Sequence, residues 1–121
     1  PALGNTALNL GFASGQGSLE TALGTPPVGK NCIRVTLAAA RRKDVDPGGF
    51  EFRLSTAANS LPTRTVPGAS LTTSFKDITN KWSVPANTPV TLQIIGLDGV
   101  GRVDALVDNV RVEALDSAQC L

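Results

Sequence analysis

The side chains that carry acid–base, nucleophilic or metal chemistry in proteins are scarce in this sequence and widely separated. The 121 residues include no histidine, which excludes Ser/His and Cys/His nucleophiles and histidine metal ligands. A glycosidase needs two carboxylates that face each other across a cleft. The acidic residues instead fall in predicted turns or at outward strand positions, as Asp44, Asp46, Asp116, Glu51 and Glu113 do. The sequence therefore predicts no catalytic residue, no bound cofactor and no enzyme activity.

The two cysteines, Cys32 and Cys120, are far apart in the sequence and lack the spacing of a zinc site. A disulfide between them would close a loop of almost the whole chain, which the loop-entropy description values at roughly 4–5 kcal/mol. It would also indicate an oxidising compartment or a particle that ends up outside the cell. Two other interpretations stay open: a bond from Cys120 to a neighbouring subunit, and two unrelated thiols.

Candidate ligand contacts come from one aromatic residue and a set of charged residues. Exposed aromatic rings are a common platform for ligands, yet this chain has no Tyr, one Trp and four Phe. Trp82 is the candidate platform, and a buried core position is its other interpretation. A polar groove is predicted from charged residues that a solvated loop explains equally well, namely Arg41, Arg42, Asp98, Arg102 and Asp104.

The elements that must position these residues are short strands. The sequence has 12 Gly and 8 Pro spread along it, and no window has apolar residues at helical spacing over three turns. Alternation of apolar and polar residues predicts strands at 6–12, 18–23, 31–40, 49–55, 70–75, 81–84, 89–95 and 104–114. Strands with one apolar face form antiparallel sheets around a shared core. The predicted fold class is therefore all-β, an antiparallel β-sandwich or jelly roll.

The same alternation predicts which side chains form the core. The inward-facing positions in the clearest strands are Ile33, Val35, Leu37, Phe50, Phe52, Leu54, Val90, Leu92, Ile94, Val110 and Val112. Residues 59–68 contain two prolines and are predicted to be an exposed crossing between strands.

Size and composition predict a single domain over residues 1–121, with 116–121 as a C-terminal tail. Hydrophobic residues make up 41% of the chain and charged residues 17%, so a core can form while the surface is poor in charge. The net charge of +1 argues against nucleic acid and anionic membranes as partners. The chain begins at Pro1 without a visible signal peptide, which fits either a trimmed cytosolic start or a mature secreted chain.

The order of the segments resembles the galactose-binding-like jelly rolls, a family that includes many carbohydrate-binding modules. The segments that carry the resemblance are GNTALNLG, GQGSLETAL, PPVGKNCIRVTLAAARR, GFEFRLS, SLTTSFKDIT, KWSVPANTPVTLQIIGLDG and ALVDNVRVEAL. No single segment is specific, but together they run from about residue 4 to 115. The resemblance implies a β-sandwich and favours sugar binding.

Two features of the resemblance bear on function. Members of the family usually begin with an additional strand, and its absence here predicts an open sheet edge at which another chain can pair. The family often binds a structural calcium partly through acids of that strand. Asp108 matches the family's aspartate before the last strand, so a calcium ion is implied there. The other interpretation of Asp108, favoured without that strand, is a residue that accepts backbone hydrogen bonds.

Two hypotheses for function follow. The first is a non-enzymatic structural module, homo-oligomeric or attached to other subunits, that decorates a larger assembly such as a virus particle. The alternative is a carbohydrate-binding module that recognises a glycan. Both hypotheses place the protein outside the cell or on a virion surface.

Overall fold

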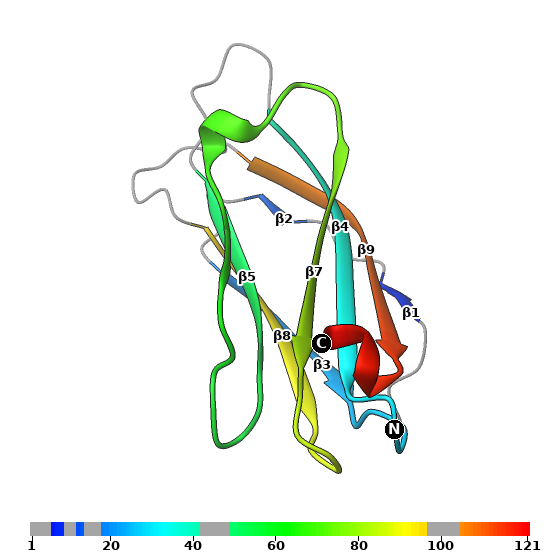
Figure 1. The fold of residues 1–121 in the computed structure, drawn as a ribbon. Helices are drawn as coiled ribbons and strands as arrows, with labels where there is room; N and C mark the ends of the chain where they lie inside the picture. Colours follow the sequence, from blue (N-terminus) through cyan, green and yellow to red (C-terminus); the bar gives the residue numbers. More distant parts are fainter. Residues whose placement is uncertain (1–5, 9–11, 14–17, 42–48, 97–104) are drawn as a thin grey trace.

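The computed structural model describes residues 6–8, 12–13, 18–41, 49–96 and 105–121. These residues form two antiparallel sheets packed face to face, as Figure 1 shows, and the predicted all-β sandwich is confirmed. In chain order the strands are β1 (Thr6–Leu8), β2 (Phe12–Ala13), β3 (Ser18–Gly24), β4 (Cys32–Arg41), β5 (Phe50–Ser55), β6 (Arg64–Val66), β7 (Lys76–Ser83), β8 (Val90–Gly96) and β9 (Ala105–Leu115). Two short 3-10 helices, η2 (Gly68–Ser70) and η3 (Ser117–Cys120), complete the described elements.

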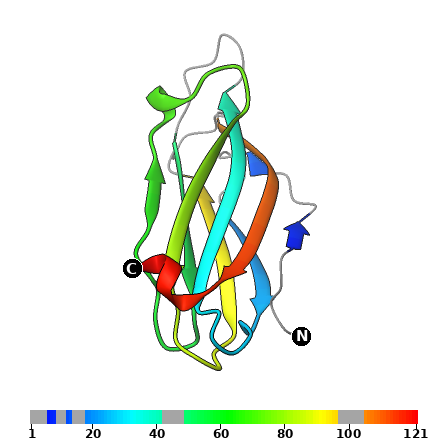
Figure 2. The ribbon, with the colours of Figure 1, turned by 45° about the vertical axis from the view of Figure 1, so that its right-hand side comes forward.

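Long-range pairing joins strands that are distant in the sequence. One sheet has the order β1-β9-β4-β7, with β2 also paired to β9, and the other has the order β3-β8-β5-β6. Figure 2 shows β7, β4 and β9 in front of the second sheet, with η3 in red across their lower end. Among the described residues, no helix has both the length and the apolar character that a membrane crossing demands.

The core lies between the two sheets and is filled by the predicted inward-facing side chains. Phe50, Phe52 and Leu54 of β5 are all fully buried, and so are Ile33 and Val35 of β4. The same holds for the central residues of β8 and β9, so the predicted core positions are confirmed: Leu37, Val90, Leu92, Ile94, Val110 and Val112 are also buried. Alternation on a pleated strand thus identified the apolar face correctly.

The predictions for residues 59–84 are correct only in part. The expected strand at 70–75 is wrong, because these residues form the end of η2 and an irregular segment. The expected strand at 81–84 lies within the longer strand β7, which begins at Lys76 and ends at Ser83. The inward positions of β7 are Ile78, Asn80 and Trp82, and the half-buried Asn80 hides the apolar alternation. The predicted crossing at 59–68 contains β6, in which Val66 alone is buried. An edge strand of this kind has little apolar pattern to recognise.

A bulge in β9 keeps its apolar side chains on the core side. Thr36 pairs with Arg111 and Ala38 with Asp108, so two residues of β9 lie opposite one residue of β4. Asn109, at the bulge, has φ of 51°. The extra residue shifts the residues that follow it by one position, so their apolar side chains again point to the core. Val107 and Val110, three positions apart, are therefore both buried.

Candidate functional site

The predicted aromatic platform lies inside the sandwich. Trp82 is only 4% exposed, its ring meets Phe52 edge to face with centroids 5.7 Å apart, and its Nε1 donates a hydrogen bond to the Pro62 carbonyl. A buried indole whose N–H has found a partner is a core residue. Trp82 therefore cannot offer its ring to a ligand, and its proposed role as a ligand contact is wrong.

The predicted polar groove falls largely outside the part of the chain that the structure describes. Arg42, Asp98, Arg102 and Asp104 all lie outside the described residues. Arg41 is the last residue of β4, is half-buried, and pairs with Ala105 at the start of β9. Its backbone N–H donates to the Thr72 carbonyl over 2.7 Å. The groove stays a prediction.

Asp108 is the residue at which the resemblance implied a calcium ion. It lies at the β9 bulge, and its Oδ1 accepts a hydrogen bond from the backbone N–H of Asn109 over 2.8 Å. Within the described ranges no three acidic or cysteine side chains gather in a way that could hold a metal ion. The calcium ion stays a prediction, while the predicted acceptance of a backbone hydrogen bond by Asp108 is present.

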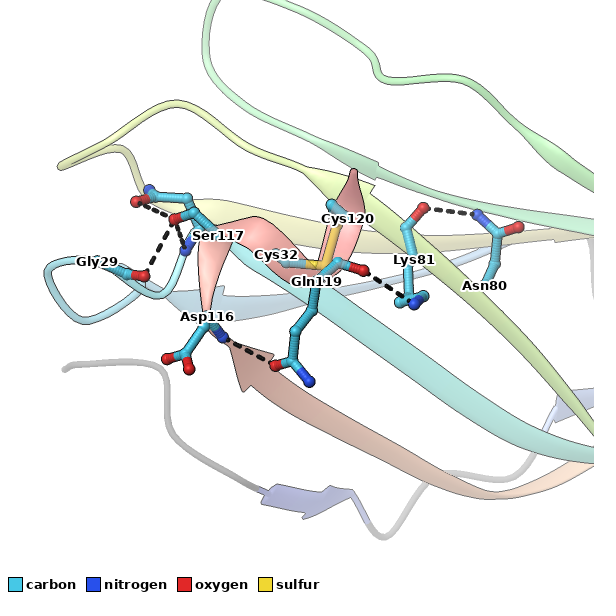
Figure 3. The surroundings of a disulfide bond; sticks show 9 residues. Gly29, Cys32, Asn80, Lys81, Asp116, Ser117, Gln119 and Cys120 are labelled. Atoms are coloured by element: carbon cyan, nitrogen blue, oxygen red, sulfur yellow. Dashed lines mark hydrogen bonds between the residues drawn. A yellow bond between two sulfur atoms is a disulfide. The ribbon is translucent and has the colours of Figure 1, made fainter.

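The two cysteines form a disulfide within the chain. Cys32, the first residue of β4, is bonded to Cys120 at the end of η3, with the two Cα atoms 5.4 Å apart (Figure 3). Cys32 is fully buried because η3 covers it. The intrachain interpretation is therefore correct. The bond from Cys120 to a neighbouring subunit is wrong, because its sulfur is already used.

Residues 116–121, expected to be a tail, form a turn fixed by hydrogen bonds as well as by the disulfide. The Ser117 hydroxyl donates to the Gly29 carbonyl and accepts from the Asn31 backbone N–H, with donor–acceptor distances of 3.0 and 3.1 Å. The Lys81 ammonium of β7 donates to the Gln119 carbonyl over 2.9 Å. Figure 3 shows this turn spanning from the loop before β4 to β7.

The outer face of the sheet containing β4 carries charges that are already paired. The guanidinium of Arg34 binds both carboxylate oxygens of Glu113 from its Nη2, each over 2.8 Å. Those hydrogen bonds from Arg34 lower the pKa of Glu113 below its ordinary value, and they raise the pKa of Arg34. Arg111 pairs with Asp77 at 2.9 Å. Arg34, Glu113, Arg111 and Asp77 are thus all in ion pairs on this face.

The outer face of the other sheet carries a hydrogen-bonded row across three strands. Gln93 of β8 lies opposite Glu20 of β3 on one side and Arg53 of β5 on the other. Its amide N–H donates to the Glu20 carboxylate over 2.6 Å, and its carbonyl accepts from Arg53 Nε over 2.7 Å. We call Glu20, Gln93 and Arg53 the polar row.

The ends of the polar row are available to solvent. Glu20 is exposed, and Arg53 is half-buried. Among the described residues, neither the terminal guanidinium nitrogens of Arg53 nor the second carboxylate oxygen of Glu20 has a partner. The polar row was not predicted from the sequence. The outward alternation of Arg53 and Gln93 was visible, but not the register that brings these residues together with Glu20.

Comparisons with known proteins give the fold. No protein-family model matches the chain, and no curated protein matches it. A solved CBM4 carbohydrate-binding module is similar, with a TM-score of 0.58, 16% identity, and coverage of 79% of this chain and 59% of that one. A CBM6 module from Cellvibrio mixtus lichenase 5A, in complex with cellotriose, has a TM-score of 0.53, 13% identity, and coverage of 91% and 86%.

Enzymes occur among the similar structures too. A Stig cyclase from Fischerella sp. TAU has a TM-score of 0.59 and 18% identity, and the match covers 84% of this chain and 58% of the cyclase. The chain thus spans less than two thirds of the CBM4 and cyclase chains. The two antiparallel sheets and these similarities together show that the chain has the β-sandwich fold of these proteins.

Proposed function

We propose that this protein is a non-catalytic carbohydrate-binding module and that its glycan lies on the outer face of the β3-β8-β5-β6 sheet. The observation that carries the proposal is the polar row of Glu20, Gln93 and Arg53. The polar row lies on a fold that this chain shares with sugar-binding proteins, and one of these was solved in complex with cellotriose. The complete absence of histidine supports a role in binding rather than in catalysis.

The chemistry of the polar row matches that of sugar hydroxyls, which donate and accept hydrogen bonds at the same time. Arg53 presents donors, Glu20 presents an acceptor, and the Gln93 amide holds both side chains in place. Binding groups that are already ordered lose less conformational entropy when the ligand arrives. Glu51 lies on the same face as the polar row. The carboxylates of Glu20 and Glu51 therefore outnumber the guanidinium of Arg53. For this reason a neutral glycan suits this face better than an anionic one.

Few aromatic rings are available to strengthen such binding. Phe75 is 52% exposed, but it lies outside the strands of this sheet, and Trp82 is buried. Polar contacts alone support a weak complex, with a dissociation constant on the order of 1 mM, equivalent to about 4 kcal/mol of binding free energy. The affinity is therefore best measured by NMR titration.

The proposal is tested with a glycan array followed by titration of the soluble hits. Arg53→Ala should weaken binding about tenfold or more, because charge-assisted hydrogen bonds are worth roughly 1.5–3 kcal/mol each. Arg64→Ala is the matched control, since Arg64 is an exposed arginine of the same sheet that lies opposite Phe52, on the other face. Equal weakening by both substitutions, or no glycan bound by the native protein, would contradict the proposal.

The assembly hypothesis has less support. The similar structures favour the carbohydrate-binding alternative, and none of them bears on virion decoration or on a homo-oligomer. The disulfide fits an oxidising, extracellular location. Light scattering separates the two hypotheses. We expect the mass of one chain, 12.5 kDa, with and without reductant. A large oligomer would favour assembly.

A further inference from the structure

A small hollow lies beside the polar row. It has a volume of about 280 Å³ and opens where β3 ends and β8 begins. Residues that line it include Ala22, Leu23, Thr25, Pro89, Val90 and Thr91. No lining residue is charged, and the polar side chains in its wall are two threonines.

Two residues in the wall of the hollow, Ala22 and Thr91, share the outer face of the sheet with the polar row, while Leu23 and Val90 belong to its inner side. Ala22 lies opposite Thr91, two positions along the strands from the pair of Glu20 and Gln93. Side chains two residues apart on a strand point to the same side and lie about 7 Å apart. A sugar ring bound to the polar row therefore has the hollow within reach of a substituent.

Local backbone geometry opens this space. The pairing of β3 with β8 shifts register between Ala22 and Gly24, and Gly24 has φ of 94°, a conformation that favours glycine. Ala22 contributes only a methyl group where the strand turns away. The hollow is thus built into the end of the strand pair.

The lining residues select the chemistry of the substituent. A sulfate or carboxylate would lose hydration without meeting a positive charge, which is costly. A sugar hydroxyl as the only substituent would make no apolar contact with the wall of the hollow. An acetamido group fits both parts, because its methyl suits Ala22 and the exposed Pro89 and its amide suits the hydroxyls of Thr25 and Thr91. Neither hydroxyl is bonded to any other described residue.

We infer that the hollow takes the acetamido group of an N-acetylated sugar whose ring lies on the polar row. The inference rests on the carbohydrate-binding function proposed above and gives that site its specificity. It assigns Ala22 and Thr91 as specificity-determining residues, distinct from Arg53 and Glu20, which hold the ring.

The test compares two soluble oligosaccharides that differ in this group, cellotetraose and chitotetraose, by NMR titration of the full chain. The native protein should bind chitotetraose about tenfold more tightly, the lower end of what a small apolar pocket discriminates. Ala22→Leu fills the hollow and should abolish this preference while leaving the affinity for cellotetraose unchanged. Ser18→Leu is the matched control, because Ser18 lies on the same face of β3 as Ala22, equally far from Glu20 in the other direction.

The outcomes separate the inference from the proposed function. Equal affinity for the two oligosaccharides, a preference that survives Ala22→Leu, or an equal effect of Ser18→Leu overturns the inference and leaves carbohydrate binding standing. If no array glycan binds to protein whose circular dichroism shows it folded, the proposed function fails and the inference fails with it.

Discussion

The sulfur of Cys120 is bonded to the sulfur of Cys32, which joins the last turn of the chain to the first residue of the central strand β4. The two residues are 88 positions apart, so the bond encloses most of the domain. The turn also carries the hydrogen bonds of Ser117 and Gln119. The C-terminal segment is thus part of the folded structure.

Removing the disulfide should lower stability strongly. Cys120→Ser frees a loop of 88 residues in the unfolded chain, and the loop-entropy description gives a loss of roughly 4–5 kcal/mol. Urea unfolding of the native and variant proteins measures the difference. Addition of reductant to the native protein should have the same effect and should leave the variant unchanged. A variant as stable as the native protein would show that the bond contributes nothing.

Replacement of Trp82 tests its role in the core. Trp82→Phe removes ring volume and leaves the Pro62 carbonyl without its donor, so we expect a loss of about 1–3 kcal/mol. Phe75→Leu, at an exposed aromatic position, should change the unfolding free energy by less than about 0.5 kcal/mol. Glycan affinity should be unaffected by either substitution, and a selective loss of binding in Trp82→Phe would contradict the buried position.

The pair of Arg34 and Glu113 should make stability depend on pH in the acidic range. Because hydrogen bonds from Arg34 lower the pKa of Glu113 in the folded state, the unfolded chain binds the proton more readily. This contribution is complete above the ordinary value of 4.5 and is lost as the pH falls through the lowered pKa. Melting temperatures between pH 2 and 7, about the range that brackets carboxylate titration, should fall less steeply for Glu113→Gln than for the native protein.

The bulge at Asn109 should tolerate glycine better than alanine. Asn109 has φ of 51°, a left-handed conformation that costs alanine roughly 1–2 kcal/mol and costs glycine little. Asn109→Ala should therefore be less stable than Asn109→Gly by about that amount in urea unfolding. Equal stabilities of the two variants would mean that the backbone relaxes at this position.

The strands and the core were accessible from the sequence because alternation is a local property. Phe50, Phe52 and Leu54 follow each other at every second position, so a pleated strand must place them on one face. The errors occurred where that signal is weak: β7 carries the inward Asn80, and β6 buries Val66 alone. The bulge that places Val107 and Val110 on one side could not be anticipated from a strict period of two.

The candidate site was decided by tertiary structure. Glu20 and Gln93 are 73 residues apart, and Arg53 and Gln93 are 40 apart. Each of these residues was recognisable as an outward residue. Which of them meet depends on strand order and register, and the burial of the whole apolar face sets both. The same is true of the disulfide, because both cysteines were evident in the sequence while only folding brought Cys120 against Cys32. The sequence by itself thus determined the all-β class, the strands with clear alternation and their inner face, and the packing of distant strands decided the polar row, the disulfide and the burial of Trp82.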